Sequence, residues 1–310
     1  MKSFDVVLLT AAKYAAPKNP TVLENNILEE DGLVEAALQK EGLRTARIAW
    51  SDPDFDWADT AYVLIRTPWD YFERFEEYSA WFLATSKRTK FINSASLVHW
   101  NSDKKYLKEL QHKGIPIPPT YFIAKDTKDS FQSVLANAKK ALQTKATEWV
   151  LKPCIAAGAF HTYRLTDTEI SSFETTFRNL LTTGDFMLQE FQFSIVNKGE
   201  LSLMLINGAY THAVLKNAKK GDFRVQDDYG GTVTNHVASV AEIALAKQVI
   251  NACEEVPLYA RVDLLEDNHG AMALAELEIF EPELWFRLYP AAATALATTI
   301  KERYFHETMA

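Results

Sequence analysis

The sequence has few of the residues that build disulfide frameworks or zinc sites. Its 310 residues include two cysteines, Cys154 and Cys253, which lie far apart and form no CxxC pair. Its seven histidines show neither HxxxH nor HxH spacing. A disulfide scaffold and a zinc site are therefore not expected, and a reducing cytoplasm is the expected location.

The sequence also lacks a block of positive charge and a long apolar run. The 33 Lys and Arg residues are outnumbered by 41 Asp and Glu residues, which gives a formal net charge of −8. Nucleic acid and anionic membrane surfaces are therefore not expected as partners. The apolar run 6–9 near the start is too short for a signal peptide and is soon followed by Lys13, so it predicts a first β-strand. No segment is long and apolar enough to predict a membrane helix.

Three common motifs of nucleotide-binding proteins and hydrolases are missing. No Gly-x-x-x-x-Gly-Lys motif occurs, which excludes a P-loop protein. No Gly-x-Gly-x-x-Gly follows the first predicted strand, so the dinucleotide-binding fingerprint is absent. A Gly-x-Ser-x-Gly nucleophile elbow is also absent, which argues against an α/β-hydrolase.

The first hundred residues alternate between strand and helix patterns. Strands are predicted at 6–9, 44–50, 62–66 and 90–93, and helices at 26–40 and 75–84. This alternation indicates an open parallel sheet covered by helices. Because ligands of such sheets bind beyond the carboxyl ends of the strands, the loops 10–21 and 66–71 are expected to face a ligand.

An acidic hairpin near the C-terminus is the most informative feature. The segments around Arg261-Val-Asp263 and Glu276-Leu-Glu278 alternate like strands, and turn residues separate them. Side chains two residues apart on a strand share one face, so Glu276 and Glu278 project together, about 6.6 Å apart along the strand. If residues 268–271 form the loop, Asp263 lies directly opposite Glu276.

Such a cluster of like charges has two interpretations. It is either the solvated face of an edge hairpin or a cation site, because unneutralised like charges placed opposite each other are destabilising. Oxygen ligands without His or Cys favour Mg²⁺ over Zn²⁺. The residues alone leave both interpretations open.

The middle of the chain contains further strands and helices. A helix capped by Ser102 is predicted to end before Gly114, and an extended Pro-rich segment follows it. Strands are expected at 121–123, 149–153, 162–165, 187–191, 200–206 and 210–216, and helices at 130–141, 169–181 and 240–253. Three domains are predicted, at 1–95, 96–186 and 187–310.

Charged residues, together with a few glycines, one glutamine and one aromatic residue, form an ordered series in the last two predicted domains. The series comprises Lys104 or Lys105, Lys152, Gly158, Gln189-Glu190-Phe191, Glu200, Lys216, Arg224, Gly230-Gly231, Asp263, Glu276 and Glu278. This order, over roughly residues 95–290, resembles the ATP-grasp superfamily of carboxylate–amine ligases. The segment 66–71 and the run from Asn93 to Lys104 further resemble the subgroup that includes the D-cycloserine-forming cyclo-ligase. The resemblance implies an α/β chain with an ATP-grasp fold of two lobes behind a Rossmann-like pre-ATP-grasp domain.

The resemblance assigns a role to each matching residue. The residues expected to bind the cofactor ATP are Lys104, Lys152, Gly158, Gln189, Glu190, Phe191, Glu200 and Lys216. Lys105 is an alternative to Lys104, Gly158 belongs to a flexible phosphate lid, and backbone groups of Glu190 and Phe191 on an edge strand contact the adenine. Asp263, Glu276 and Glu278 are the Mg²⁺ ligands, although many relatives carry Asn at the last position. Arg224 and Arg261 are the catalytic cations. The substrate is expected to meet Arg66, Trp69 and Asp70, for which core packing is an alternative role at Trp69.

The implied reaction is ATP-dependent ligation. A small carboxylate would be activated as an acyl phosphate and joined to an amine, with release of ADP and phosphate. Three alternatives remain open from the residues: an intramolecular cyclo-ligase, a small-molecule kinase and a non-catalytic ATP-binding module. The expected partners are a small-molecule carboxylate and amine. Proteins of this kind are often homodimers, and nothing in the sequence decides that point.

Overall fold

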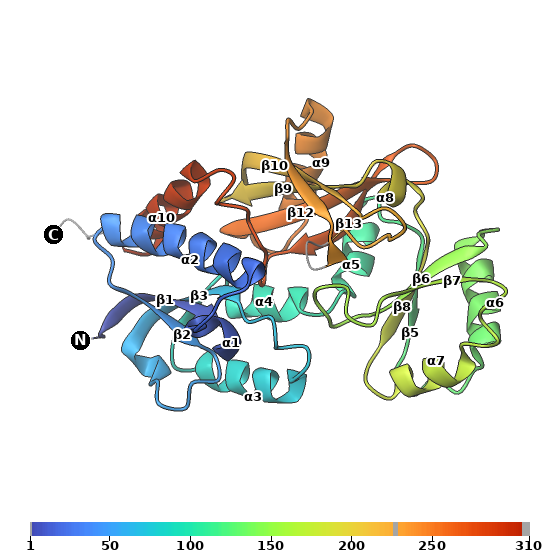
Figure 1. Cartoon of the computed structure of the whole chain (residues 1–310), viewed down its shortest axis with the longest axis horizontal. Helices are drawn as coiled ribbons and strands as arrows, with labels where there is room; N and C mark the ends of the chain where they lie inside the picture. Colours follow the sequence, from blue (N-terminus) through green and yellow to red (C-terminus); the bar gives the residue numbers. More distant parts are fainter. Residues whose placement is uncertain (1, 226–228, 306–310) are drawn as a thin grey trace.

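The computed structural model describes residues 2–225 and 229–305, and within them three β-sheets follow one another along the molecule (Figure 1). The chain is of the α/β class, as the sequence predicts. Both described ends of the chain lie at the same end of the molecule, beside the first sheet.

The first sheet is parallel, as the sequence predicts. It contains β1 (Phe4–Thr10), β2 (Thr45–Ala49), β3 (Thr60–Thr67) and β4 (Lys90–Ile92) in the order β2-β1-β3-β4. Its helices are α1 (Ala12–Ala15), α2 (Val22–Lys40), η1 (Trp57–Asp59) and α3 (Phe75–Thr85). Helix α2 begins four residues earlier than predicted, because Thr21 and Glu24 form a capping box that satisfies the first free N–H groups.

The second sheet is antiparallel and small. Strands β5 (Thr120–Ile123), β6 (Glu148–Pro153), β7 (Tyr163–Thr166) and β8 (Phe186–Glu190) pair in the order β5-β8-β6-β7. Helices α6 (Phe131–Leu142) and α7 (Glu174–Leu181) lie beside it. Strand β8 belongs to this sheet, so the predicted domain boundary after residue 186 separates most of β8 from the strands with which it pairs.

The third sheet is antiparallel and carries the acidic hairpin. Its strands are β9 (Glu200–Ile206), β10 (Ala209–Asn217), β11 (Thr232–His236), β12 (Tyr259–Glu266) and β13 (Met272–Glu278), in the order β11-β10-β9-β12-β13. Helix α8 (Ser194–Asn197) precedes it, and α9 (Val240–Asn251) connects β11 to β12. Strand β11 is absent from the sequence prediction.

Two short helices join the sheets, where the sequence predicted one. Helix α4 (Ala95–Asn101) ends at Ser102, and α5 (Tyr106–His112) begins after Lys105. The predicted N-cap at Ser102 is therefore wrong: its hydroxyl donates to the His99 carbonyl and closes the preceding helix instead.

Two asparagines attach the first domain to the acidic hairpin. The Asn93 amide donates to the carbonyls of Tyr259 and Ile279 at 2.9 and 2.8 Å, and its oxygen accepts from the Leu258 N–H. The Asn101 amide nitrogen likewise donates to the Leu277 carbonyl, and its oxygen accepts from the Ile279 N–H. Both amides are buried, so these bonds fix how β12 and β13 sit against the first domain.

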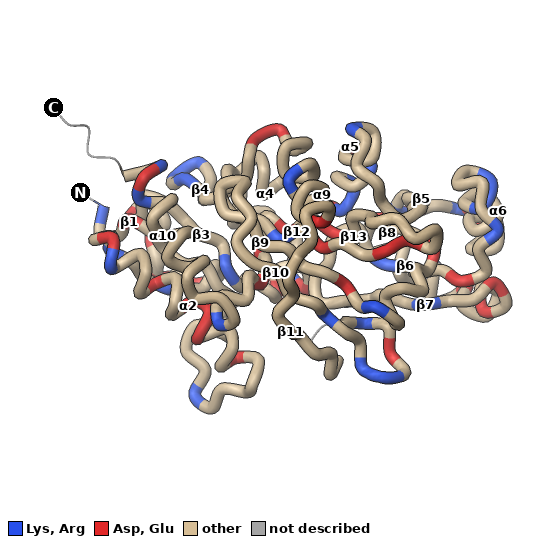
Figure 2. Tube along the Cα trace, turned by 90° about the horizontal axis from the view of Figure 1, so that it is seen from above, with Lys and Arg blue, Asp and Glu red and all other residues tan. Residues whose placement is uncertain are grey.

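The last helix, α10 (Ala291–Tyr304), returns to the first domain and packs against α2 (Figure 1). Among the described residues, no helix is long and apolar enough to cross a membrane. Figure 2 shows acidic and basic residues interspersed along the whole length of the molecule. Cys154 and Cys253 are both free thiols.

Candidate active site

A cavity of about 460 Å³ is lined by residues from all three sheets and their loops. Tyr14 and Trp69 come from the first domain, Lys152 and Gln189 from the second sheet, and Asp263 from the third. Fourteen sequence-predicted site residues line it: Trp69, Lys104, Lys152, Gly158, Gln189, Glu190, Phe191, Glu200, Lys216, Arg224, Arg261, Asp263, Glu276 and Glu278. Segments far apart in the sequence thus meet at one place.

The register of the hairpin places Asp263 opposite Glu276, as predicted. The loop of the hairpin differs from the expected loop 268–271. Glu266 pairs with Met272, so the loop begins at residue 267. An irregularity between Asp263 and Leu264 leaves Ala275 without a partner and restores the predicted alignment.

The same pairing brings opposite charges together across the third sheet. Lys216 on β10 faces Glu200 on β9, and its Nζ forms ion pairs with Glu200 and, at 3.2 Å, with Asp263. Arg261 faces Glu278 and contacts it, and its guanidinium also holds Asp263 at 2.8 Å. The buried Ser202 hydroxyl donates to Asp263 at 2.6 Å. Cross-strand pairing thus neutralises much of the acidic cluster.

These contacts set the protonation state of the cluster. Burial alone would raise the pKa of Asp263, but Arg261 and Lys216 outweigh it and lower the pKa to about 2. Burial likewise opposes ionisation of Glu276, and Lys104 and Lys152 bring its pKa below the usual value. Both carboxylates are therefore anionic at neutral pH, which is the form a metal ion requires.

The donor set fits a hard divalent cation in its chemistry and position. Asp263, Glu276 and Glu278 supply only oxygen, and all three line the cavity. Within residues 2–225 and 229–305, no three acidic, His or Cys side chains converge closely enough to hold an ion as they stand. Instead Lys104 contacts Glu276 and Arg261 contacts Glu278. A bound cation would replace these two side chains in neutralising the glutamate charges.

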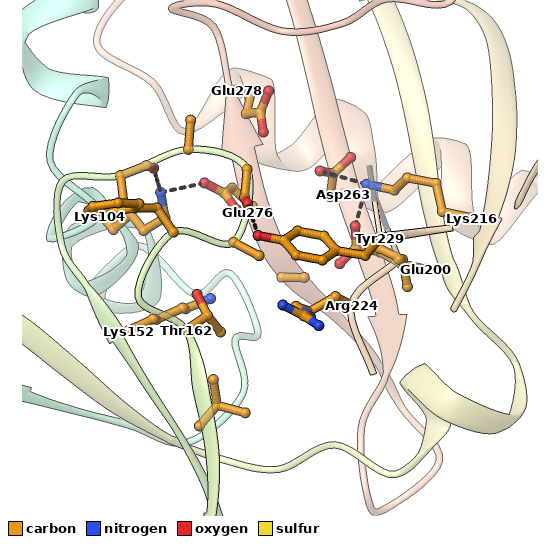
Figure 3. Close-up of a pocket in the computed structure, with 18 of the residues that line it drawn as sticks. Lys104, Lys152, Thr162, Glu200, Lys216, Arg224, Tyr229, Asp263, Glu276 and Glu278 are labelled. Carbon is orange, nitrogen blue, oxygen red and sulfur yellow. Dashed lines mark hydrogen bonds and ion pairs between the residues drawn. The ribbon is translucent and has the colours of Figure 1, made fainter. Parts of the chain in front are cut away.

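A second group of cations lies opposite the acidic row (Figure 3). Lys104 Nζ lies 2.8 Å from Glu276 and donates to the Ala156 carbonyl at 2.7 Å. Lys152, at the end of β6, has no ion-pair partner in the part of the chain that the structure describes, and burial lowers its pKa. Lys105 points elsewhere and pairs with Asp185. Of the two candidate lysines, Lys104 is thus the one at the cavity.

The small-residue loop after β6 lies over these cations. Gly158 has a positive φ of 58°, which glycine adopts without strain. Its carbonyl accepts a hydrogen bond from the Tyr229 hydroxyl at 3.3 Å. The Arg224 guanidinium stacks on the Tyr229 ring at 3.7 Å and pairs with Asp222. Tyr229, which the sequence analysis missed, thus joins the loop to the predicted catalytic arginine (Figure 3).

The predicted adenine contacts need a correction. Strand β8 is not an edge strand, because β5 and β6 flank it. The backbone N–H of Glu190 donates to the Pro119 carbonyl, and that of Phe191 donates to the Glu148 carbonyl. Neither N–H is therefore available to a ligand. The N–H of the next residue, Gln192, makes no hydrogen bond with the described residues, and Gln192 lines the cavity.

Two of the three predicted substrate residues lie outside the cavity lining. Arg66 is 1% exposed and pairs with Asp31 on α2, because it shares the face of β3 that α2 covers. Asp70 accepts from the Trp50 indole at 2.7 Å and pairs with Arg74. Both side chains therefore hold the first domain together. Trp69 does line the cavity, and its indole donates to the Glu281 carbonyl at 3.0 Å.

Four charged residues of the lining, Lys13, Glu73, Glu281 and Glu283, were not predicted as site residues. Lys13, from the loop 10–21, lies 4.7 Å from the centre of the Tyr14 ring. Glu281 follows the hairpin, is 8% exposed and accepts a hydrogen bond from the Tyr71 hydroxyl at 3.2 Å. Burial raises the pKa of Glu281 to about 7. Glu281 comes three residues after Glu278 in the sequence, but only the fold shows that its side chain is buried.

Comparisons with known proteins show what the chain is similar to. Residues 6–93 match the family model "D-cycloserine synthetase DcsG, N-terminal domain". The cycloserine biosynthesis protein DcsG of Streptomyces lavendulae is 29% identical over 279 residues, which cover 86% of this chain and 91% of that protein.

Solved structures extend the likeness to the whole chain. The crystal structure of D-cycloserine synthetase DcsG aligns with a TM-score of 0.85 and 25% identity, over 96% of this chain and 99% of that one. The ATP-grasp ligase PsnB, solved with a precursor variant, Mg and ADP, aligns with a TM-score of 0.61 and 13% identity, over 97% and 99% of the two chains, which shows the fold alone. Together with the cavity and its ordered residues, these alignments support an ATP-grasp superfamily assignment for the chain.

Proposed function

We propose that the chain is an ATP- and Mg²⁺-dependent ligase that activates a small carboxylate as an acyl phosphate and joins it to an amine, with release of ADP and phosphate. One observation carries this proposal. A single cavity contains the cations Lys104 and Lys152, the small-residue loop and the acidic row of the hairpin, and it extends to side chains of the first domain. The cysteine content favours a cytoplasmic location for this activity.

The nucleotide end of the cavity follows from the positions of its polar groups. Lys104 and Lys152 would bind phosphate oxygens, and the loop around Gly158 would cover them with backbone N–H groups. The adenine would lie against the end of β8, near the Glu190 carboxylate, and the Gln192 N–H is the backbone donor available there. Glu200 and Lys216 form the wall between this end and the hairpin.

The metal end would be held by Asp263, Glu276 and Glu278. A Mg²⁺ ion bound by these carboxylates would neutralise phosphate charge and favour transfer of the terminal phosphoryl group. Arg261, which contacts two of the three carboxylates, would stabilise the charge that develops on that group, together with Arg224.

The reaction then balances in two steps. A substrate carboxylate oxygen attacks the γ-phosphorus, the bond to ADP breaks and an acyl phosphate forms. The amine nitrogen next attacks the acyl carbon, the C–N bond forms, and phosphate leaves with the electron pair of the broken C–O bond. The nitrogen releases one proton to solvent. The loop 154–162 would exclude water, which would otherwise hydrolyse the acyl phosphate.

An intramolecular version of the same reaction is the second candidate. It is favoured by the alignment with cycloserine biosynthesis proteins along most of both chains, since cycloserine is a cyclic hydroxamate whose acyl carbon and nitrogen belong to one ring. In this version the carboxylate and the nitrogen nucleophile belong to one molecule. The same residues would act on it, because both versions pass through an acyl phosphate.

The test is ADP and phosphate release from Mg²⁺-ATP with a panel of amino acids, small dicarboxylates and paired amines. The panel includes 3-aminooxyalanine, the open-chain acid whose internal amide is cycloserine. Release that requires both a carboxylate and an amine supports the intermolecular ligase, and release with one compound that yields a ring supports the cyclo-ligase. A phosphorylated final product would show a kinase, and ATP binding without release from any compound would favour a non-catalytic module.

A further inference from the structure

We propose that Glu281 binds the nitrogen nucleophile of the ligation and orients it toward the acyl phosphate. This inference rests on the proposed function and adds a residue to it. It assigns a ligand chemistry, an amine or other N–H donor, to the part of the cavity next to the first domain. The carboxylate would be a specificity-determining group that acts in the second step of the reaction.

Glu281 differs from its acidic neighbours in having no cationic partner. Glu276 pairs with Lys104, Glu278 with Arg261, and Glu283 with Arg287 at 2.5 Å. Within the described residues Glu281 makes no ion pair, and Tyr71 is the partner of one of its two oxygens. A carboxylate that is more than nine-tenths buried, lines a cavity and has an oxygen left over is costly unless a ligand satisfies it.

The surroundings of Glu281 hold it in place before any ligand binds. Trp69 donates its indole N–H to the Glu281 carbonyl, which fixes the backbone. The neighbouring Phe280 ring packs at 4.8 Å from the Tyr71 ring, and the Tyr71 hydroxyl donates to the carboxylate. A carboxylate supported in this way loses little conformational entropy when it binds a substrate nitrogen. Its hydrogen bond to that nitrogen can therefore orient the nucleophile.

Glu281 lies on the first-domain side of the nucleotide-binding candidates, close enough for Lys104 and Arg261 to influence its charge. It is linked through Trp69 and Tyr14, whose rings lie 6.1 Å apart in an edge arrangement, to the first-domain side of the cavity. The phosphate-binding candidates Lys104 and Lys152 come from α4–α5 and β6 instead. A nitrogen held by Glu281 would therefore approach from the first domain, while ATP occupies the space between the second and third sheets.

Charged and titratable groups face Glu281 from several elements. Lys104 and Arg261 favour its anionic form, whereas Glu276 and Glu278 oppose it. Tyr71 and Tyr78 lie on the first-domain side. The charge that Glu281 presents to a ligand is thus set jointly by β12, β13 and the first domain, and the test below keeps pH constant.

The experiment is a competition between the substrate amine and hydroxylamine for the acyl phosphate. Hydroxylamine is a small nucleophile that reacts without being positioned, and it converts the acyl phosphate into a hydroxamate. Wild type, Glu281→Gln and Tyr71→Phe are compared on the substrates that the ADP-release panel identifies, at one pH and one hydroxylamine concentration. The readout is the amide-to-hydroxamate ratio, in which "amide" means the product formed with the substrate nitrogen, linear or cyclic, and "hydroxamate" means the product formed with free hydroxylamine. Glu73→Gln is the matched control, because Glu73 is an exposed carboxylate of the same cavity.

We expect Glu281→Gln to lower the amide-to-hydroxamate ratio by about 10- to 100-fold, the effect of losing one charge-assisted hydrogen bond. Tyr71→Phe should shift it in the same direction by a smaller factor. Total ADP release in the presence of hydroxylamine and the affinity for the ATP analogue AMPPNP should stay within about twofold of wild type, which a misfolded variant would not show. Glu73→Gln should leave the ratio unchanged.

The outcomes separate this inference from the proposed function. An unchanged ratio in Glu281→Gln, with ADP release intact, overturns the role of Glu281 and leaves the ligase standing. A fall in ADP release that matches the fall in amide also overturns it, because Glu281 would then act in the first step. If wild type releases no ADP under any of these conditions, the ligase proposal fails and the assignment of Glu281 falls with it.

Discussion

Lys104 Nζ lies 2.8 Å from the Glu276 carboxylate and joins the segment after α4 to strand β13. The same nitrogen donates to the Ala156 carbonyl of the small-residue loop. One side chain thus connects the acidic hairpin with the loop that would cover the phosphates. Burial would lower the pKa of Lys104, but Glu276 more than compensates and raises it, so the lysine is charged at neutral pH.

This contact predicts that Lys104→Met lowers kcat/KM for ATP by about 10- to 100-fold, because a charged hydrogen bond to a phosphate is lost from a buried site. Lys105→Met is the matched control. Its side chain pairs with Asp185 outside the cavity, so its kcat/KM should stay within about twofold of wild type. ADP release measured at several ATP concentrations checks both values. Equal losses in the two variants would contradict the assignment to Lys104.

The acidic row predicts a loss of metal-dependent turnover. The double change Glu276→Gln/Glu278→Gln should reduce turnover by more than about 100-fold, since even groups that only support metal ligands account for 10- to 100-fold effects. The fold should persist, because the amides keep the shape of the side chains. The measurement is ADP release over a Mg²⁺ titration, with circular dichroism as the check of folding. Wild-type turnover in the double variant would contradict the metal assignment.

Gly199 holds Lys216 in position through the turn before β9. Its φ is +80°, and a Cβ at this residue would lie 2.3 Å from the Lys216 carbonyl oxygen. Gly199→Ala should therefore lower the free energy of unfolding by more than about 2 kcal/mol, from backbone strain plus the clash. It should also reduce activity, because the clash displaces the strand that carries Lys216.

Gly270 provides the comparison for that change. Its φ is +86°, but nothing lies within 4 Å of a Cβ built there. Gly270→Ala should therefore show the backbone strain alone, about 1 kcal/mol. Urea unfolding of both variants separates the two contributions. Equal losses in the two variants would show that the predicted contact with Lys216 does not matter.

The sequence was most informative where periodicity and charge acted together. Period-two alternation was enough to place Glu276 and Glu278 on one face of a strand. The alignment of Asp263 with Glu276 was predicted from a loop at 268–271, and it holds only because the unpaired Ala275 compensates for the different loop. The parallel first sheet and the antiparallel hairpin followed from strand patterns in the same way. These features depend on neighbours in sequence, which local reasoning can use.

Features that depend on distant partners could not be predicted. The sequence places Arg66 at the start of a loop, where it could contact a substrate. In the structure its guanidinium pairs with Asp31 of α2, which is distant in the sequence but next to it in space. The prediction that β8 is an edge strand is wrong, because β5, about 65 residues earlier, pairs with the edge of β8 that β6 leaves free. The burial of Glu281 results from Trp69 and Tyr71, which lie more than 200 residues away. Strand order and domain docking decide each case, and neither leaves a local pattern.

His212 predicts a pH dependence of stability on the acidic side. It is 7% exposed on β10, and its Nε2 lies 2.9 Å from the Leu284 carbonyl, to which the neutral ring donates. Burial lowers its pKa from 6.5 to about 4 in the folded chain. Between these two values the unfolded chain binds a proton that the folded chain does not, so stability decreases as the pH falls through this window. At pH 4 this contribution amounts to about 3 kcal/mol.

His212→Gln removes the titrating group and keeps a hydrogen-bond donor for Leu284. Urea unfolding of the wild type and His212→Gln at pH 7.5, 6, 5 and 4 gives the difference between their free energies of unfolding at each pH. Carboxylates common to both chains cancel in that difference, which should shift in favour of the variant by up to about 3 kcal/mol as the pH falls. A difference that is constant with pH would show that His212 is not buried in neutral form. Because Leu284 lies between Glu283 and Trp285, which both line the cavity, protonation of His212 in the folded chain near pH 4 should disturb this wall and lower activity there.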